Sequence, residues 1–170
     1  MENTRVKLAY KQEGAGKLIV LLHGFCGSKE YWKEVIPYLK DSYKVIAVDV
    51  RGHGETETTT VGYGIHDMAE DLYEFFKEND LKDAYIFGHS MGGYITLDFV
   101  EHHPELVKGY GLIHSTALPD SPEAKDNRSK GVSKVEQQGV SLFIHDLIPK
   151  LLAKDTREKE KEVLRTLIDI

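Results

Sequence analysis

The sequence has 170 residues and a mass of 19.3 kDa, and its 22 Lys and Arg against 28 Asp and Glu give a net charge of −6 with His neutral. No basic stripe offsets this acidic balance, which argues against a nucleic-acid partner. Hydrophobic residues make up 41% of the chain, as in ordinary globular domains, and the longest apolar run, Leu18 to Leu22, is too short to span a membrane. A single cysteine and a start without a signal-peptide pattern favour a cytoplasmic protein.

Short β-branched runs alternate with stretches of helical spacing along the first two-thirds of the chain. This alternation predicts an α/β fold, with a mostly parallel sheet and helices on both faces. In chain order, the predicted strands are residues 6–12, 18–22, 44–50, 84–88 and 109–115. The predicted helices are residues 31–39, which Pro37 should break or kink, then 65–77, with an apolar face and a solvated face that includes Asp71, and 91–103, which Pro104 ends.

The composition changes after residue 115. Residues 119–138 are mostly polar and charged and show no strand pattern, and two helical patterns follow over residues 140–152 and 156–170. Asp155 and Glu158 are a candidate capping pair for the second of these helices. We therefore predict a core domain over residues 1–115 and a separate, polar and helical region over residues 116–170.

One motif has the spacing of a serine nucleophile. Gly88-His89-Ser90-Met91-Gly92 reads G-x-S-x-G, with a predicted buried strand before it and a predicted helix after it. A serine at such a sharp turn adopts strained backbone angles and needs glycine on both sides. We therefore predict that Ser90 is a nucleophile, and the alternative is a serine that only caps the following helix.

A second segment lies where an oxyanion hole would be needed. His23-Gly24-Phe25-Cys26-Gly27 directly follows the predicted strand 18–22, and the ends of parallel strands meet at one sheet edge. The backbone amides of Phe25 and Met91 could therefore hold the negative charge that acyl transfer places on a carbonyl oxygen. The alternative for Phe25 is packing on the core. Asp49-Val50-Arg51-Gly52-His53-Gly54 follows the next strand and is predicted to form a structural turn.

These three motifs, HGF, DVRGHG and GHSMGG, each at a strand end and in this order, resemble the N-terminal portion of the α/β-hydrolase-fold superfamily, in its serine hydrolase branch. The resemblance covers residue 6 to about residue 115. It implies that residues 116–170 are the start of a helical cap region, and that Phe25 and Met91 are the oxyanion donors. It also implies two further strands carrying the catalytic acid and histidine, which we expect beyond Ile170. In some relatives the acid follows the fifth strand, so Asp120 is an alternative acid, the other reading being a solvated loop carboxylate.

The remaining candidate residues have simpler interpretations. Cys26 is predicted to be a small buried residue and His89 a packing residue. His102 and His103 are adjacent on a helix and cannot easily share one ion, so their interaction with the helix dipole is the expected role. We expect neither a metal nor a cofactor.

Taken together, the sequence predicts a serine hydrolase that acts on a small carboxylic ester or similar acyl substrate, with this chain alone inactive. Which substrate of this class is used is left open. The alternative is a non-catalytic binding chain with the same core, or an inactive fragment of the hydrolase. Partners other than the acyl substrate are expected only through an open sheet edge at residues 109–115, which would pair with or swap into another copy.

Overall fold

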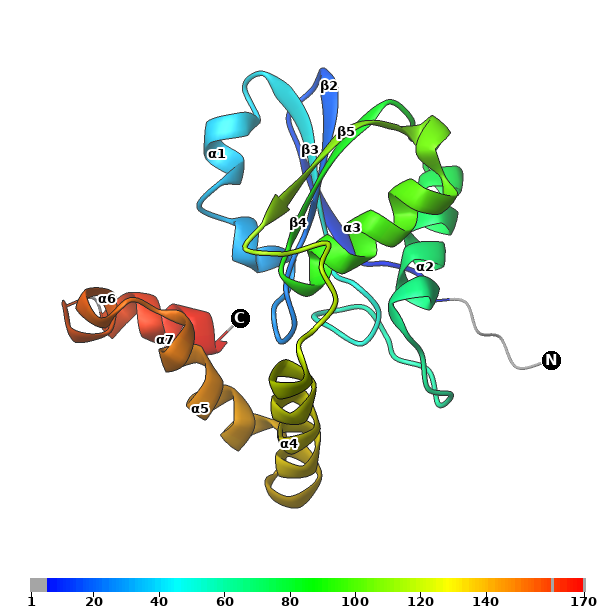
Figure 1. Ribbon diagram of the computed structural model, residues 1–170. Helices are drawn as coiled ribbons and strands as arrows, with labels where there is room; N and C mark the ends of the chain where they lie inside the picture. Colours follow the sequence, from blue (N-terminus) through cyan, green and yellow to red (C-terminus); the bar gives the residue numbers. More distant parts are fainter. Residues whose placement is uncertain (1–5, 160, 170) are drawn as a thin grey trace. The chain divides into compact units, whose positions relative to one another are not determined.

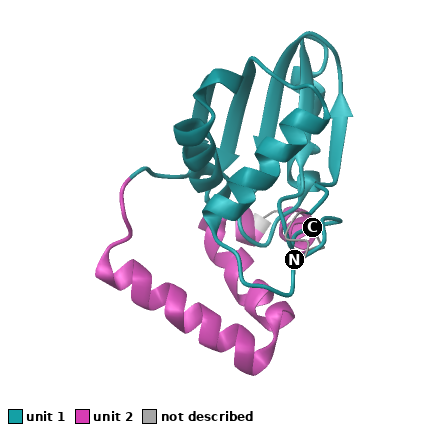
Figure 2. Ribbon diagram, turned by 90° about the vertical axis from the view of Figure 1, so that its right-hand side faces the viewer, with its two compact units in different colours: residues 1–117 teal, residues 118–170 magenta. Residues whose placement is uncertain are grey.

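The computed structural model describes residues 6–159 and 161–169, and the chain divides into two compact units, residues 1–117 and 118–170 (Figure 2). The first unit holds the sheet and the second is helical. The sequence places the corresponding boundary after residue 115. None of the helices in the described ranges is both long and apolar enough to cross a lipid bilayer.

The first unit is built on one five-stranded sheet (Figure 1). Its strands are β1 (Tyr10–Glu13), β2 (Lys17–Leu22), β3 (Tyr43–Val48), β4 (Ala84–His89) and β5 (Val107–Ile113), in the order β1-β3-β2-β4-β5. Only β1 is antiparallel to its neighbour, so the predicted mostly parallel α/β sheet is confirmed. The predicted first strand is wrong in its start, because pairing with β3 begins at Tyr10 and not at residue 6.

Helices cover both faces of this sheet (Figure 1). The 3-10 helix η1 (Lys29–Trp32) and α1 (Ile36–Leu39) lie on one face, while α2 (Ile65–Glu78) and α3 (Met91–His102) lie on the other, and η2 (Pro104–Leu106) leads into β5. Alternate residues of β2 point to opposite faces of the sheet and pack in two different core clusters. Val20 and Leu22 belong to the core under α2 and α3, whereas Leu21 packs with Trp32 and Ile36.

The helix predicted over residues 31–39 is interrupted, as expected for a segment that contains Pro37. The chain forms η1 and then the separate short helix α1, and the interruption lies just before Pro37, at residues 33–35. Pro37 lies in the first turn of α1. An N–H group at that position would have no intrahelical acceptor, so proline, which lacks the N–H, is tolerated there.

The amphipathic helix α2 confirms the predicted apolar face, with one correction on its opposite face. Met68, Leu72 and Phe76 are buried as expected. Asp71, predicted to be solvated, is 5% exposed. Its carboxylate accepts hydrogen bonds from Nε and Nη2 of Arg51, at 2.6 and 2.5 Å, so a charge partner on the preceding loop accounts for its burial.

The second unit consists of α4 (Pro122–Gln138), α5 (Val140–Leu151), α6 (Lys154–Lys159) and α7 (Lys161–Asp169). The sequence assigns no helix to residues 122–138, yet α4 forms there, with the Ser121 hydroxyl accepting from Ala124 N–H and Pro122 in the first turn. α6 begins at Lys154, so Asp155 lies inside its first turn and does not precede it as a cap. Ile170, the last residue of the predicted final helix, lies outside the described residues.

Candidate active site

Ser90 occupies a strained turn between β4 and α3. Its φ of 49° and ψ of −112° are rare for a residue with a side chain and cost about 1–3 kcal/mol. The turn is held by hydrogen bonds on both sides. Ser90 N–H donates to the Ile113 carbonyl at 3.0 Å, and the Ser90 carbonyl accepts from Gly93 N–H at 2.9 Å and from the Ser115 hydroxyl at 2.8 Å. The end of β5 therefore fixes the conformation of Ser90.

The glycines on either side of Ser90 are required by space. Gly88 and Gly92 do not have positive φ angles. A Cβ on Gly92 would lie 2.5 Å from the Leu22 carbonyl oxygen and 2.6 Å from that of His23, and a Cβ on Gly88 would collide with the backbone of Gly92. The absence of side chains lets α3 start directly against the end of β2, and within residues 88–92 only Ser90 has a positive φ.

The Ser90 hydroxyl does not cap α3. A capping serine accepts a hydrogen bond from an N–H in the first helical turn, and Ser90 makes no such bond although it is the residue that precedes the helix. Its side chain is half-buried, not sealed in the core. The capping alternative therefore does not account for a serine at this position.

The loop after β2 lies against this turn. A Cβ on Gly24 would be 3.3 Å from the Cβ of Ser90 and 2.8 Å from Nδ1 of His89, so only glycine fits here without displacing them. The loop closes on itself through a hydrogen bond of 3.1 Å from Gly27 N–H to the Gly24 carbonyl. The two segments that the sequence predicts to cooperate are therefore in contact.

Phe25 and Met91 follow the two residues that meet there. Phe25 does not pack in the core, since its side chain is 53% exposed and its ring lies 6.0 Å from that of His53. Met91 is the first residue of α3 and packs against the core under α2 and α3. The first N–H groups of a helix have no intrahelical acceptor, so the Met91 amide is of the kind that binds anions.

His23 ties the loop after β2 to the loop after β3. Its ring is fully buried, with Nδ1 2.8 Å from the Gly24 carbonyl oxygen and Nε2 accepting a hydrogen bond of 3.1 Å from Val50 N–H. Because Nε2 accepts, the proton resides on Nδ1 and the ring is neutral. Burial is the main cause that lowers the pKa of His23 to about 4.

The His23 pKa makes the stability of the fold sensitive to acid. A pKa below the ordinary 6.5 means that the unfolded chain takes up the proton first. The resulting stabilisation is complete above about pH 6.5, is lost as the pH falls toward 4, and amounts to about 3 kcal/mol. Urea titrations at pH 7.0 and 4.5 should show this loss in the parent chain and a smaller one in His23→Gln. The exposed His145→Gln should behave like the parent, and an equal loss in His23→Gln would contradict the assignment.

Asp49 organises the same sheet edge from β3. Its buried carboxylate accepts hydrogen bonds from the Lys29 N–H at 2.5 Å, from Lys29 Nζ at 2.7 Å and from Glu55 N–H at 2.9 Å. Burial raises the pKa of Asp49, but these hydrogen bonds and the Lys29 charge outweigh burial and lower it. The sequence predicts a structural turn for this segment and does not indicate the contact with Lys29, which lies 20 residues earlier.

His89 packs beside the turn. Its ring stacks on Tyr31 with centroids 5.0 Å apart, and the ring of His114 lies 6.2 Å away. Burial, followed by the neighbouring His114, lowers the pKa of His89, so the ring is neutral at neutral pH. Its Nδ1 is buried and has no hydrogen-bond partner among the described residues. Tyr31 lies in the helix predicted over residues 31–39, and its spacing in the sequence does not indicate that it stacks on His89.

Cys26 is half-buried, so the prediction of a buried residue is correct only in part, and burial raises the pKa of its thiol to about 11. A thiol with this pKa is protonated at neutral pH and is a poor nucleophile. Although Cys26 is next to Phe25, its thiol is therefore not an alternative to Ser90 as the nucleophile.

Asp120 belongs to the helical unit, where both of its carboxylate oxygens accept from Arg128, Oδ2 from Nε at 2.5 Å and Oδ1 from Nη2 at 3.2 Å. This pairing lowers the pKa of Asp120. Its role as an alternative acid stays a prediction. Of the histidines after Ser90, His114 directly follows β5 and has a positive φ, and His145 lies on α5.

Comparison with known proteins agrees with this geometry. The family profile described as alpha/beta hydrolase fold matches residues 17–159. A thermophilic esterase from Thermogutta terrifontis has a similar structure, with a TM-score of 0.88 and 31% identity, over 96% of this chain and 61% of the esterase chain.

Two further relatives are named for reactions other than ester hydrolysis. The dihydrolipoyllysine-residue acetyltransferase component of the acetoin cleaving system from Cupriavidus necator is 30% identical over 71% of this chain and 32% of its own length. Bifunctional epoxide hydrolase 2 from Sus scrofa is 28% identical over 69% of this chain and 22% of its own length. The chain thus spans less than half of these curated relatives. With a matching profile over most of its length and the strand-turn-helix geometry at Ser90, this chain belongs to the alpha/beta hydrolase fold family.

Proposed function

We propose that this chain carries the nucleophile and the oxyanion hole of a serine hydrolase that acts on a small carboxylic ester through an acyl-enzyme. The observation that carries the proposal is the backbone of Ser90, held at φ 49° by β5 and α3 while its side chain caps no helix. A protein has no folding reason to keep a strained serine there, and strained residues cluster at functional sites.

In this mechanism, the Ser90 hydroxyl oxygen attacks the ester carbonyl carbon and its proton passes to a general base. The Phe25 and Met91 amides hold the negative oxygen of the tetrahedral intermediate. The alcohol leaves with a proton, and water then attacks the acyl-serine and releases the acid. We expect the base and its acid partner outside these 170 residues, since the chain spans 61% of the esterase chain that it resembles.

The comparisons support hydrolase chemistry at a coarse level, with esterases among the relatives. The epoxide hydrolase relative shows that the fold serves several reactions, so the reaction class has to be inferred from the nucleophile residue at the turn. Serine at position 90 favours acyl transfer. We would expect an aspartate at this turn if the protein opened epoxide rings by covalent catalysis.

A fluorophosphonate probe tests the nucleophile directly, because it reacts at an appreciable rate only with a serine whose hydroxyl is activated by a base. The 170-residue chain, supplied with the downstream segment of its gene product, should be labelled on Ser90. Ser90→Ala should abolish the label, whereas Ser129→Ala, an exposed serine on α4, should leave it unchanged. Label on another serine, found by mass spectrometry of the modified peptide, would overturn the proposal.

A further inference from the structure

A histidine, an aspartate and a second histidine meet where α2 and α3 pack together. His66 lies in the first turn of α2, while Asp98 and His102 lie one turn apart on α3. His66 Nδ1 is 2.9 Å from Asp98 Oδ1, and His102 Nδ1 is 3.3 Å from the same oxygen. The two rings are 4.8 Å apart, and one ligand atom from each of the three residues lies within 4.8 Å of the others.

We propose that His66, Asp98 and His102 bind a divalent transition-metal ion of the zinc class. Two imidazole nitrogens and one carboxylate oxygen form a donor set suited to zinc, copper or nickel and poorly suited to magnesium or calcium. In a tetrahedral site with bonds of about 2.0–2.1 Å, neighbouring ligand atoms are about 3.4 Å apart. The distances of 2.9 and 3.3 Å to Asp98 Oδ1 are close to that spacing, and the ligand atoms of the two histidines lie within 4.8 Å of each other, so small side-chain adjustments complete the geometry.

The ligand atoms can exchange their present contacts for the ion. His102 Nδ1 also lies 2.9 Å from the Asp98 backbone carbonyl oxygen, so the free ring carries its proton on Nδ1. With the proton moved to Nε2, each ring presents the Nδ1 lone pair, and the ion takes the place between both rings and the Asp98 carboxylate. No side chain has to leave its helix face.

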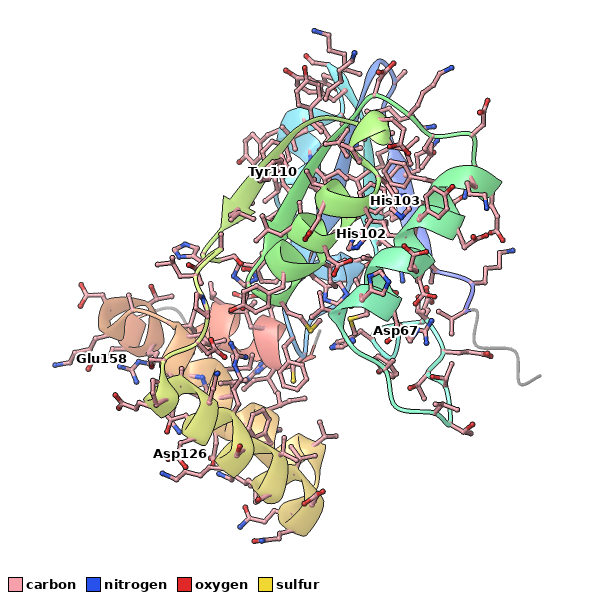
Figure 3. All side chains as sticks on the ribbon, turned by 45° about the vertical axis from the view of Figure 1, so that its right-hand side comes forward. Asp67, His102, His103, Tyr110, Asp126 and Glu158 are labelled. Carbon is pink, nitrogen blue, oxygen red and sulfur yellow. The ribbon has the colours of Figure 1, made fainter. Side chains whose placement is uncertain are left out.

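Charge and orientation favour a cation at this position. The carboxylates of Asp67 and Glu70 act on His66 in addition to Asp98, although Asp67 also accepts from Gly64 N–H at 2.7 Å. His103, adjacent to His102 (Figure 3), turns instead to Glu70, with Nε2 2.8 Å from its Oε1. The adjacent histidines thus diverge, because α3 ends at His102 and His103 follows it with non-helical angles, and the second histidine of the site comes from α2.

The cluster is open to solvent and separate from Ser90. The side chains of His66, Asp98 and His102 are 58%, 23% and 45% exposed, so an ion can enter and water can complete its coordination. Along α3, Asp98 and His102 are eight and twelve residues after Ser90, about 12 and 18 Å at 1.5 Å per residue. A bound ion would therefore join α2 to α3 and would not take part in the attack on the ester.

Calorimetric titration of the chelator-treated 170-residue chain with ZnCl2 at pH 7 tests this site. We expect one zinc ion per chain and a higher melting temperature with zinc, because the ion binds both helices only in the folded protein. His66→Gln, His102→Gln and Asp98→Asn should each weaken binding by about tenfold or more, the scale on which groups that hold a metal in place act. MgCl2 should give no comparable binding or stabilisation.

His145→Gln is the matched control. On α5, His145 Nδ1 lies 2.9 Å from the Ser141 carbonyl oxygen, the same contact to the residue four positions earlier that His102 makes, but outside the cluster. Its zinc affinity should equal that of the parent chain. Equal affinity in His66→Gln and the parent, or an equal loss in His145→Gln, would overturn the site. Should Asp98→Asn fail to fold by circular dichroism, the two histidine variants decide the outcome.

Discussion

Replacing Ser90 with alanine is expected to lower kcat for an activated ester by about a million-fold in the gene product that includes the downstream segment, the scale seen when a serine hydrolase loses its nucleophile. Alanine forms no acyl-enzyme. The oxyanion amides remain, so a small rate above that of water should survive. Steady-state hydrolysis of a p-nitrophenyl ester measures both rates.

Two comparisons make this result decisive. Ser129→Ala should retain the parent kcat, since this exposed serine is outside the turn. The 170-residue chain by itself should resemble the Ser90→Ala protein in rate, because we expect the base in the remaining part of the fold. Turnover by the chain alone within tenfold of the longer protein would show that the base lies among these residues, and would point to Asp120 as the acid or to a histidine among these residues as the base.

Loss of the Asp71 carboxylate is expected to destabilise the fold by about 3–5 kcal/mol, the cost of leaving one member of a buried ion pair alone. Asp71→Leu leaves the Arg51 guanidinium, which is 6% exposed, facing an apolar side chain. Chemical denaturation at pH 7 gives the free energy of unfolding. Glu78→Leu, at the end of the same helix and exposed, should change it by less than about 1 kcal/mol.

A double variant separates the ion pair from simple packing. Arg51→Met together with Asp71→Leu removes both charges, and buried pairs replaced by apolar groups of similar size are often neutral. Its free energy of unfolding should therefore lie closer to that of the parent than the value for Asp71→Leu. Equal destabilisation in the single and double variants would show that Asp71 supports the fold by some contact other than Arg51.

The strands predicted at residues 18–22 and 84–88 agree with β2 and β4 to within one residue, whereas those predicted at 44–50 and 109–115 differ from β3 and β5 by up to two residues at their ends. Residues 18–22 and 84–88 form continuous apolar runs, and the observed strands extend these by one residue at one end. Helix α4 was missed for a matching reason. It has no buried residue, so an apolar period was absent, and its start depends on Ser121 and Pro122. The burial of Asp71 was missed because its partner, Arg51, lies 20 residues earlier.

For the candidate site, the motifs placed Ser90 and the loop of Phe25 at one sheet edge, and the structure brings these segments into contact. The residues that hold them there were not visible in the sequence. His23 and Asp49 act by hydrogen bonds to loops 20 or more residues away, and a motif carries no information on such distances. The only sequence signal for these roles is that His23 and Asp49 each directly follow a buried strand. A polar side chain buried there requires hydrogen-bond partners.

The hydrogen bond that Ser90 donates to Ile113 links the nucleophile to an edge strand, β5. In the sheet order of the described strands β5 is terminal, and edge strands open locally at a lower free energy than central ones. Since Ser90 N–H donates to the Ile113 carbonyl, its amide exchanges with solvent only when the end of β5 separates from the turn. Fraying of that edge thus releases the constraint on the strained serine, so hydrogen exchange at one amide reports how often the nucleophile loses its reactive pose.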